Sequence, residues 1–352
     1  MNTDTLIVAV INRKTKQVSF LSIPRDLWVH IPTYGWGRIN IAHRIGHRTN
    51  YPGRGPGLLM RTIEESFGIP IDHWVRVGYD GFARVVDELG GVDMIVPCRV
   101  NLRYMAPTSA DEQEMILEPG VHHMDGATAL RYVRTRRGDS DFERAHRQQQ
   151  FIKAVWNQFK SPDIIPKIPG LWLALRDSFA TDLKLGDILA LAPLVLDLQP
   201  QRIRSRYIGP GQVEGWTTPG DARVLVPIPE RVEEVVAGLY APPAASGEQV
   251  AGEAARIQVW NGTHRRQLAL IAADHLRWYG LQVVDTRPAD NPDYAKTQII
   301  VYNDRPQALE ILTRVLKVKP ASIIQRADSN QLADDVQADL LVILGKDYDP
   351  CR

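Results

Sequence analysis

The sequence predicts an α/β protein built from two domains. The chain has 352 residues, which exceeds the usual length of one domain. Short apolar runs typical of strands alternate with longer segments whose apolar residues recur at helical spacing. Residues 241–255 are mainly Ala, Pro, Gly, Ser and Glu and therefore indicate a linker. We predict a larger α/β domain over residues 1–240 and a small α/β domain over residues 256–348.

The first domain opens with two apolar runs, Leu6–Ile11 and Val18–Ile23, which a short polar stretch joins as in adjacent strands. A strand–helix–strand unit is predicted next, with strands His73–Val77 and Val92–Val96 around a helix capped by Asp80. Further helices are predicted over Leu58–Phe67, Ala127–Arg134, Phe142–Phe159 and Leu185–Leu198.

The second domain repeats this alternation on a smaller scale. Its predicted strands are Ile257–Trp260, Leu281–Val284, Gln298–Tyr302 and Leu340–Leu344. Its predicted helices are Leu268–Tyr279 and Pro306–Leu316.

Composition excludes several classes of protein. The formal net charge is +1, so no overall field attracts nucleic acid or an anionic membrane. No apolar run approaches the length that spans a bilayer, and no signal peptide is recognisable, so a soluble cytoplasmic chain is expected from these features alone. The two cysteines, Cys98 and Cys351, have no metal-site spacing and predict no disulfide framework.

Residues 129–149 form the most informative segment, because they hold six arginines and no lysine. Guanidinium groups bind phosphate oxygens through two parallel hydrogen bonds and stay charged when partly desolvated. Arg131 and Arg134 share a face of a helix, and Arg134 and Arg136 share a side if the chain there is extended. This spacing indicates an anion site.

Asp141 is predicted to cap the next helix, which places Arg144 in its first turn, with Arg147 and Gln148 on the same face. A cation there opposes the helix dipole unless a bound anion compensates. A solvated surface, with Asp139, Asp141 and Glu143 as partners of the arginines, is the open alternative. A nucleic-acid-binding arm is disfavoured because the rest of the chain is close to neutral.

A second group of polar residues follows the strand Val18–Ile23. Arg25 and Asp26 lie where the strand ends, the usual position of ligands in α/β proteins, although a plain surface ion pair is also possible. Asp4 precedes the first strand and is a candidate Mg²⁺ ligand if a phosphate site lies nearby. Proteins typically hold Mg²⁺ through one or two carboxylates together with phosphate oxygens.

Taken together, these residues resemble the LytR–CpsA–Psr family of cell-envelope phosphotransferases. The resemblance covers nearly all of residues 1–240 through the motifs Asp4–Leu6, Ser22–Asp26, Arg38–Asn40, Asp80–Phe82, Leu89–Asp93, Gly120–Gly126 and the arginine segment through Gln149. Residues 256–348, with Val259–Thr263 and Ile343–Asp347, resemble the C-terminal domain often attached to this family.

The resemblance implies a central sheet flanked by helices in an extracytoplasmic, membrane-anchored enzyme. Such an enzyme moves a glycopolymer from a polyprenyl-pyrophosphate carrier to peptidoglycan with Mg²⁺. It implies catalytic roles for Arg25, Asp26, Arg134 and Arg136, and substrate binding by Arg38, Arg131, Asp141, Arg144, Arg147 and Gln148. Asp4 would be a metal ligand, and Arg38 stands where a lysine is common. The family has a membrane helix, a strand and an acidic ligand before the Asp4 position, so we expect an N-terminally truncated chain.

The expected reaction is attack of an acceptor hydroxyl on the glycan-linked phosphate, with Asp26 or Asp4 assisting as base. The lipid tail needs an apolar groove, for which Phe151, Val155, Leu171, Leu173 and Leu189 are candidates, although packing in the core is the favoured role of each. Two alternatives stay open: a polyprenyl-pyrophosphate hydrolase, and a non-catalytic envelope protein that binds phospholipid or polyanion.

Overall fold

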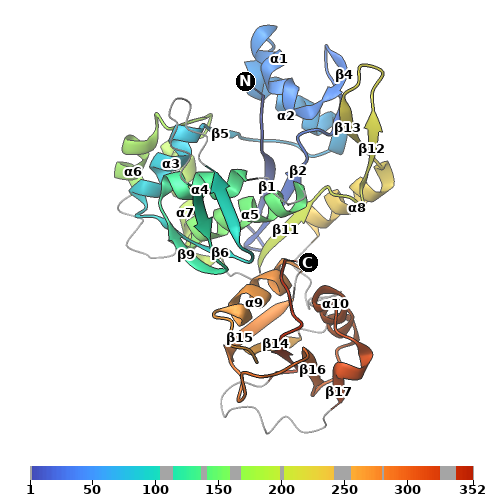
Figure 1. Cartoon of the computed structure of the whole chain (residues 1–352). Coiled ribbons are helices and arrows are strands. Elements are labelled where there is room, and N and C mark those ends of the chain that lie inside the picture. The colour runs from blue at the N-terminus through green and yellow to red at the C-terminus, as the bar shows by residue number, and fades with distance from the viewer. Residues whose placement is uncertain are drawn as a thin grey trace. The chain divides into compact units, whose positions relative to one another are not determined.

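The computed structural model describes residues 2–103, 114–135, 141–158, 168–198, 202–241, 255–279, 281–325 and 338–351. The chain forms two compact units (Figure 1). The first comprises Met1–Val92 and Asp125–Ala241, and the second comprises Asp93–Met124 and Pro242–Arg352. The segment Asp93–Met124 falls inside the first domain that the sequence predicts, but in the structure it belongs to the second unit. Residues 242–254 of the predicted linker lie outside the described residues.

A three-stranded sheet organises the first unit. Strands β1 (Leu6–Asn12) and β2 (Gln17–Ile23) pair antiparallel, and β11 (Ile203–Tyr207) runs parallel to β2 on its other side. The central strand β2 is buried along almost its whole length, as expected for a strand covered on both faces. Helix α5 (Asp141–Gln158) contacts β11, and helix α8 (Pro229–Tyr240) contacts both β2 and β11. The predicted adjacent strands are therefore confirmed.

The remaining elements of the first unit surround this sheet. The strands are β3 (Trp28–Ile31), β4 (Gly35–Arg38), β5 (Val75–Val77), β10 (Phe179–Thr181), β12 (Val213–Thr217) and β13 (Arg223–Pro227). The helices are α1 (Ala42–Arg48), α2 (Arg54–Phe67), α3 (Tyr79–Glu88), α4 (Gly126–Arg134), α6 (Ile168–Leu175) and α7 (Leu185–Asp197). The predicted helices are confirmed with small shifts of their ends, and α2 ends at Gly68, whose φ of 65° favours glycine.

The two strands and the helix of the predicted strand–helix–strand unit are present as β5, α3 and β6 (Val92–Val96), but the two strands do not pair with each other. β5 pairs with β10, whereas β6 pairs with β9 (Gly120–Met124), so the two strands join different sheets. All three residues of β5 are exposed, so it has no buried face to place beside another strand of a central sheet. Asp80 is likewise not the cap of α3, because Gly78 takes that position and Asp80 lies in the first turn.

Two glycines allow close approach of the elements around α3. A Cβ at Gly126, in the first turn of α4, would overlap the carbonyl oxygen of Ala83 on α3. A Cβ at Gly81 would overlap the carbonyl oxygen of Ser178, just before β10. Glycine is required at both positions because it has no Cβ. The Asp80–Phe82 and Gly120–Gly126 motifs therefore contain packing residues as well as polar ones.

The second unit contains a five-stranded sheet in the order β15–β14–β18–β16–β17. Its strands are β14 (Arg256–Asn261), β15 (Gln282–Pro288), β16 (Gln298–Val301), β17 (Ile323–Gln325) and β18 (Leu340–Leu344). The buried central strand β18 and helices α9 (Leu268–Trp278) and α10 (Pro306–Leu316) form one core with β14. The α/β prediction for this region is confirmed, and β17 is an addition to it.

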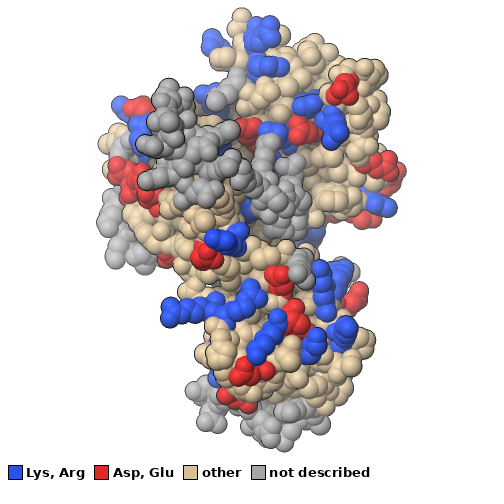
Figure 2. Space-filling model, viewed as in Figure 1, with Lys and Arg blue, Asp and Glu red and all other residues tan. Residues whose placement is uncertain are grey.

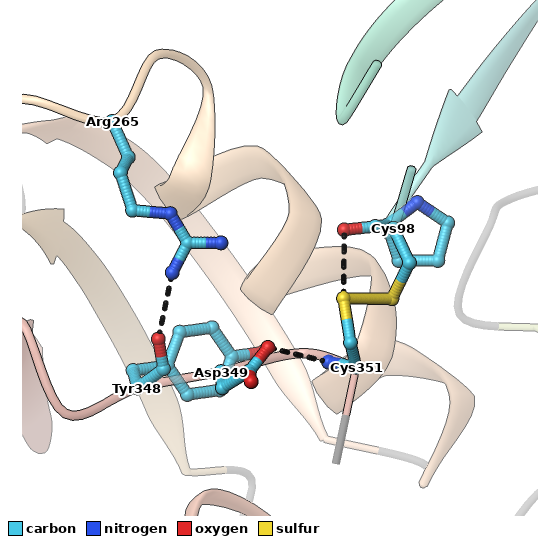
Figure 3. Close-up of a disulfide and its surroundings, with 6 residues drawn as sticks. Cys98, Arg265, Tyr348, Asp349 and Cys351 are labelled. Carbon is cyan, nitrogen blue, oxygen red and sulfur yellow. Dashed lines mark hydrogen bonds between the residues drawn. A yellow bond between two sulfur atoms is a disulfide. The ribbon is translucent and has the colours of Figure 1, made fainter. Parts of the chain in front are cut away.

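The segment Asp93–Met124 joins the C-terminal part of the chain in the second unit. It contains β6 from Asp93 onward, the paired strands β7 (Val100–Arg103) and β8 (Glu114–Leu117), and β9. Cys98 in this segment forms a disulfide with Cys351, with Cα atoms 5.6 Å apart (Figure 3). The prediction of no disulfide framework is therefore wrong. Two cysteines separated by 253 positions carry no spacing signal, and only folding brings them together.

In the part of the chain that the structure describes, no helix combines the length and apolarity needed to cross a bilayer. On the face shown in Figure 2, Lys and Arg side chains are interspersed with Asp and Glu, in keeping with a net charge of +1.

Candidate functional site

The register of β1 and β2 brings Asp4 and Arg25 together. Leu6 lies opposite Ile23 in the antiparallel pair, so the residue two before Leu6 meets the residue two after Ile23. Arg25 Nη1 donates to Asp4 Oδ1 at 2.9 Å. Two predicted site residues that are 21 positions apart thus form a direct ion pair.

Asp26 extends this ion pair into a small charged network. Its Oδ2 lies 3.3 Å from Arg25 Nε, and its Oδ1 lies 3.5 Å from Arg38 Nη1. Main-chain hydrogen bonds from Asn40 to Arg25 and from Ile39 to Leu27 hold the Arg38 segment beside the end of β2. Four of the predicted site residues, from three separate segments, therefore meet in one place: Asp4, Arg25, Asp26 and Arg38.

Tyr79 at the start of α3 adds a group that the sequence analysis missed. Its hydroxyl donates to Asp4 Oδ2 at 2.6 Å. The hydrogen bond to Asp4 raises the pKa of Tyr79 above 10, as do burial and the charge of Asp4, and Arg134 opposes this effect in part. The only signal in the sequence is the position of Tyr79 directly before the Asp80–Phe82 motif.

Arg134 reaches this network through the ring of Tyr79. Its guanidinium carbon lies 3.9 Å from the ring centroid, within range of a cation–π interaction. Arg134 and Arg131 occupy the last turn of α4, where the helix dipole favours cations. Arg131 also helps to lower the pKa of Asp125, although hydrogen bonding from Thr128 is the main cause. Arg136 lies outside the described residues.

Asp125 fixes the start of α4. It is the N-cap residue, and its carboxylate accepts a hydrogen bond of 2.8 Å from the main-chain nitrogen of Thr128. Together with the close contact at Gly126, this cap sets the direction of the helix whose far end carries Arg134.

Helix α5 contributes Arg144, Arg147 and Gln148 in different ways. Gln148 Nε2 donates to Thr5 Oγ1 at 2.9 Å, beside Asp4. Arg144 is 9% exposed and lines a cavity with Gln148. Arg147 is buried, donates to the carbonyl oxygen of Thr135 at 2.8 Å and lies over the ring of Tyr132. The side chain of Asp141 lies outside the described residues, so its predicted cap and site roles stay predictions.

Gln149 anchors α5 to the sheet and was also missed. The side chain is 1% exposed, and its Nε2 donates to Ser22 Oγ at 2.8 Å and to the carbonyl oxygen of Arg206 at 3.1 Å. These bonds join α5 to β2 and β11 at once. They fix the register at which Gln148 and Arg144 face the cavity.

The cavity in the first unit has a volume of about 340 Å³. Its polar lining includes Asp4, Thr5, Arg144 and Gln148. Its apolar lining includes Leu6, Ile23, Ala145, Ile208, Val213 and Leu225. A charged end beside an apolar wall suits a ligand that is itself part anion and part hydrocarbon.

Of the candidate lipid-groove residues whose side chains are described, none lines this cavity: Phe151, Val155, Leu173 and Leu189. Phe151 stacks on Phe82 with ring centroids 4.3 Å apart, so it belongs to the contact between α5 and α3. Leu173 and Leu189 are exposed on α6 and α7. Their apolar side chains made these residues candidates from the sequence. Only the tertiary structure shows that β1, β2, α5 and residues 207–225 supply the cavity walls. Leu171 has no described side chain.

The described residues contain no group of three or more His, Cys, Asp or Glu side chains that could hold a metal ion by themselves. Asp4 is half-exposed at the cavity, and its carboxylate oxygens contact Arg25 and Tyr79. A single carboxylate at an anion site fits Mg²⁺ that takes its other ligands from phosphate oxygens and water. It does not fit a preformed cage of protein ligands.

Several curated bacterial proteins are similar to this chain. Polyisoprenyl-teichoic acid–peptidoglycan teichoic acid transferase TagT of Bacillus subtilis is 33% identical over 196 residues, which are 56% of this chain and 58% of that protein. The probable cell wall biosynthesis protein LcpB of Corynebacterium glutamicum is 37% identical over 161 residues, or 46% of this chain and 35% of that protein. The chain thus spans about half the length of the curated relatives it matches.

Solved structures are similar as well. TagV of B. subtilis has a TM-score of 0.57 at 28% identity, with 68% of this chain and 88% of that chain covered. A structure of TagT with bound octaprenyl pyrophosphate lipid has a TM-score of 0.50 at 26% identity, with 68% of this chain and 83% of that chain covered.

The family models divide the chain in two. The LytR cell envelope-related transcriptional attenuator model matches residues 254–348, which hold the five-stranded sheet. The LytR_cpsA_psr family model matches residues 1–217, which hold the arginine segment and the charged network of Asp4 and Arg25. This chain is a member of the LytR–CpsA–Psr family.

Proposed function

We propose that this protein transfers a glycopolymer from a polyprenyl-pyrophosphate carrier to peptidoglycan. The observation that carries the proposal is the meeting of Arg25 and Arg134 around Asp4 and Tyr79, beside a cavity with one charged and one apolar side. The names of TagT and TagV as teichoic acid–peptidoglycan transferases support it, as does the octaprenyl pyrophosphate bound to TagT.

The arginines bind and neutralise the diphosphate. Phosphoryl-type transfer depends mainly on positioning and on stabilising the charge that spreads over the phosphate oxygens. Arg25 follows the end of β2 and Arg134 lies in the last turn of α4, whereas Arg144 of α5 lines the cavity together with Asp4. The apolar wall holds the hydrocarbon chain and excludes water from the carrier side of the diphosphate.

The transfer step exchanges one phosphorus–oxygen bond for another. The acceptor hydroxyl oxygen bonds to the phosphorus that carries the glycan, and the bond from that phosphorus to the polyprenyl phosphate breaks. The proton of the hydroxyl passes to a carboxylate, for which Asp26 and Asp4 are the groups within the network. Polyprenyl phosphate leaves as the second product.

Asp4 is the residue that would hold Mg²⁺ in this proposal. When bound, the ion adds positive charge next to the phosphate oxygens. Chelation with excess EDTA should abolish transfer, and added Mg²⁺ should restore it. Asp4→Asn should require more Mg²⁺ for half-maximal activity, and an unchanged requirement would contradict the assignment.

The disulfide supports an extracytoplasmic location. Structural disulfides persist in oxidising compartments and are rare in the reducing cytoplasm of mesophiles. A bond between Cys98 and Cys351, which lie 253 positions apart, is therefore better suited to the cell envelope than to the cytoplasm.

The test is a reconstituted reaction with a polyprenyl-pyrophosphate glycan, peptidoglycan fragments and Mg²⁺. Arg134→Ala should lower the turnover rate by about 100-fold to 1,000-fold, as for loss of one preorganised donor to the reacting oxygens. Arg48→Ala is the matched control, because Arg48 is exposed on α1 and does not line the cavity. Glycan release that does not depend on the acceptor would contradict transfer and indicate a hydrolase. Binding of the donor without turnover would indicate a non-catalytic protein.

A further inference from the structure

A second cavity lies within the second unit, and the transfer reaction does not use it. Its volume is about 570 Å³, which is large enough for a sugar-sized ligand. One wall is the stretch Glu118–His122, which follows β8 and includes the first residues of β9. The opposite wall comes from the C-terminal part of the chain and consists of Asn261, Thr263–Gln267 and Pro288.

Direct contacts hold the two walls together. The main-chain nitrogen of Val121 donates to Gln267 Oε1 at 2.7 Å, and Gln267 is the N-cap residue of α9. Gly120 has a φ of 147° and lies so close to Gln267 that a Cβ would press on its amide oxygen. These contacts fix Glu118–His122 beside the start of α9.

The disulfide joins the same two parts of the chain covalently. Cys98 belongs to the segment that carries the first wall, and Cys351 follows Tyr348 near the end of the chain. Arg265 Nη1, from the second wall, donates to the carbonyl oxygen of Tyr348 at 2.9 Å, as Figure 3 shows. The disulfide and this hydrogen bond therefore tie both walls to the last residues of the chain.

The turn that carries the arginines is rigidly held. Asn261 Oδ1 accepts hydrogen bonds from the nitrogen and the hydroxyl of Thr263, and Asn261 Nδ2 donates to the carbonyl oxygen of Arg265. The neighbouring Gly262 packs so tightly against Leu344 and Tyr294 that a side chain would not fit. Arg265 and Arg266 are thus presented from a fixed backbone, which reduces the entropy lost when a ligand binds.

The balance of charge at the cavity is positive. Its one carboxylate, Glu118, lies 3.0 Å from Arg99, which offsets its charge. Arg266 has no hydrogen-bond or ion-pair partner among the described residues. Arg265 uses one nitrogen for Tyr348 and has further N–H groups to donate. Two arginines that are consecutive in the sequence line the cavity, and the one without a protein partner among the described residues has all its N–H groups available for an oxyanion.

We propose that this cavity binds a saccharide that carries an oxyanion, with Arg265 and Arg266 as the anion-binding residues and the Cys98–Cys351 disulfide holding its walls. The volume and the many polar groups of the lining fit a sugar, and the two arginines fit its charge. The oxyanion can be a phosphate of the transferred polymer or a carboxylate of the wall acceptor. The proposal does not depend on transferase activity, because it concerns binding by the second unit.

Calorimetric titration of the oxidised full chain at low salt tests the site. The probes are N-acetylglucosamine 6-phosphate, N-acetylmuramic acid and neutral N-acetylglucosamine. Every titration is repeated in an Arg134→Ala background, so that binding at the charged network of the first unit is recognised and removed. We expect one of the two anionic sugars to bind at least tenfold more tightly than the neutral one, and the preferred probe identifies the oxyanion.

Arg266→Ala should weaken binding of that probe about tenfold. Arg314→Ala, an exposed arginine of α10 that does not line the cavity, is the matched control and should leave binding unchanged. The double variant Cys98→Ser and Cys351→Ser should also bind more weakly, with its circular dichroism spectrum as the check of folding. Equal binding of neutral and anionic sugars, or binding that responds to Arg134→Ala but not to Arg266→Ala, would overturn the proposal. Unchanged binding by the double serine variant would overturn the role of the disulfide.

Discussion

The hydroxyl of Tyr79 donates a 2.6 Å hydrogen bond to Asp4, a residue 75 positions earlier in the chain. The other carboxylate oxygen of Asp4 forms an ion pair with Arg25, and the guanidinium group of Arg134 lies over the ring of Tyr79. Tyr79 therefore links a carboxylate at the start of β1 to an arginine at the end of α4. One aromatic side chain sets the separation of two cations that we assign to the diphosphate.

Two variants of Tyr79 separate its hydroxyl from its ring. Tyr79→Phe keeps the ring beneath Arg134 and loses the hydrogen bond to Asp4, and it should lower kcat/KM by about fivefold to tenfold. Tyr79→Leu also loses the cation–π contact with Arg134 and should lower kcat/KM by about another fivefold. Steady-state kinetics of the transfer reaction measure both effects. Equal activity of the two variants would show that the ring does not position Arg134.

The raised pKa of Tyr79 predicts how this link responds to pH. The stabilisation from a raised pKa is fully present below the ordinary value near 10 and is lost as the pH rises through the higher folded value. The hydrogen bond should therefore persist from pH 6 to pH 10. The absorbance of tyrosinate, measured as the difference between wild type and Tyr79→Phe, should show Tyr79 titrating above pH 10. A transition below pH 10 would contradict the assigned environment.

The contact between α3 and α4 at Gly126 should be intolerant of any side chain. Gly126→Ala places a Cβ against the carbonyl oxygen of Ala83 and should lower the free energy of unfolding by about 1–3 kcal/mol. It should also reduce activity, because α4 carries Arg134. Gly186→Ala on α7 is the control: beyond its own turn of helix, no described residue has an atom within 4 Å of the added Cβ, and the variant should be neutral or stabilising. Urea unfolding and the transfer assay measure both variants, and equal stability of the two would contradict the packing argument.

The cap at Asp125 predicts a stability effect that depends on pH. Asp125→Ala removes the acceptor for the Thr128 nitrogen and should cost about 1 kcal/mol at neutral pH. Because the pKa of Asp125 is lowered, its contribution is present above the ordinary value near 3.8 and is lost as the pH falls through the lower folded value. Urea unfolding at pH 7 and below pH 3 should show the difference between wild type and variant shrinking in acid. Asp177→Ala, at a position that is 85% exposed, should show no comparable loss at pH 7.

Local patterns in the sequence were sufficient to predict most elements near the site. Alternating apolar residues identified β1 and β2, and helical spacing with terminal signals identified α2, α4, α9 and α10. The turn between β1 and β2 is short, so the pairing register of the hairpin by itself places Asp4 opposite Arg25. The arginine segment was recognisable from its composition, and four of its arginines lie in the two consecutive helices α4 and α5.

Contacts between remote segments could not be predicted in this way. Tyr79 at the start of α3 meets Asp4, which lies 75 positions earlier, and no spacing rule relates the two positions. The cavity walls come from β1, β2, α5 and residues 207–225 instead of the apolar helices α6 and α7. The partners of β5 and β6 likewise depended on which faces became buried.

By itself, the sequence determined the α/β class, the elements with strong periodicity, the family, and the arginines available to bind an anion. The tertiary structure decided which of those arginines share a site, which tyrosine joins them, and that Cys98 and Cys351 form a bond. The reason is physical. Periodicity records how each residue relates to its near neighbours in the chain, whereas packing of buried surfaces determines which distant residues meet.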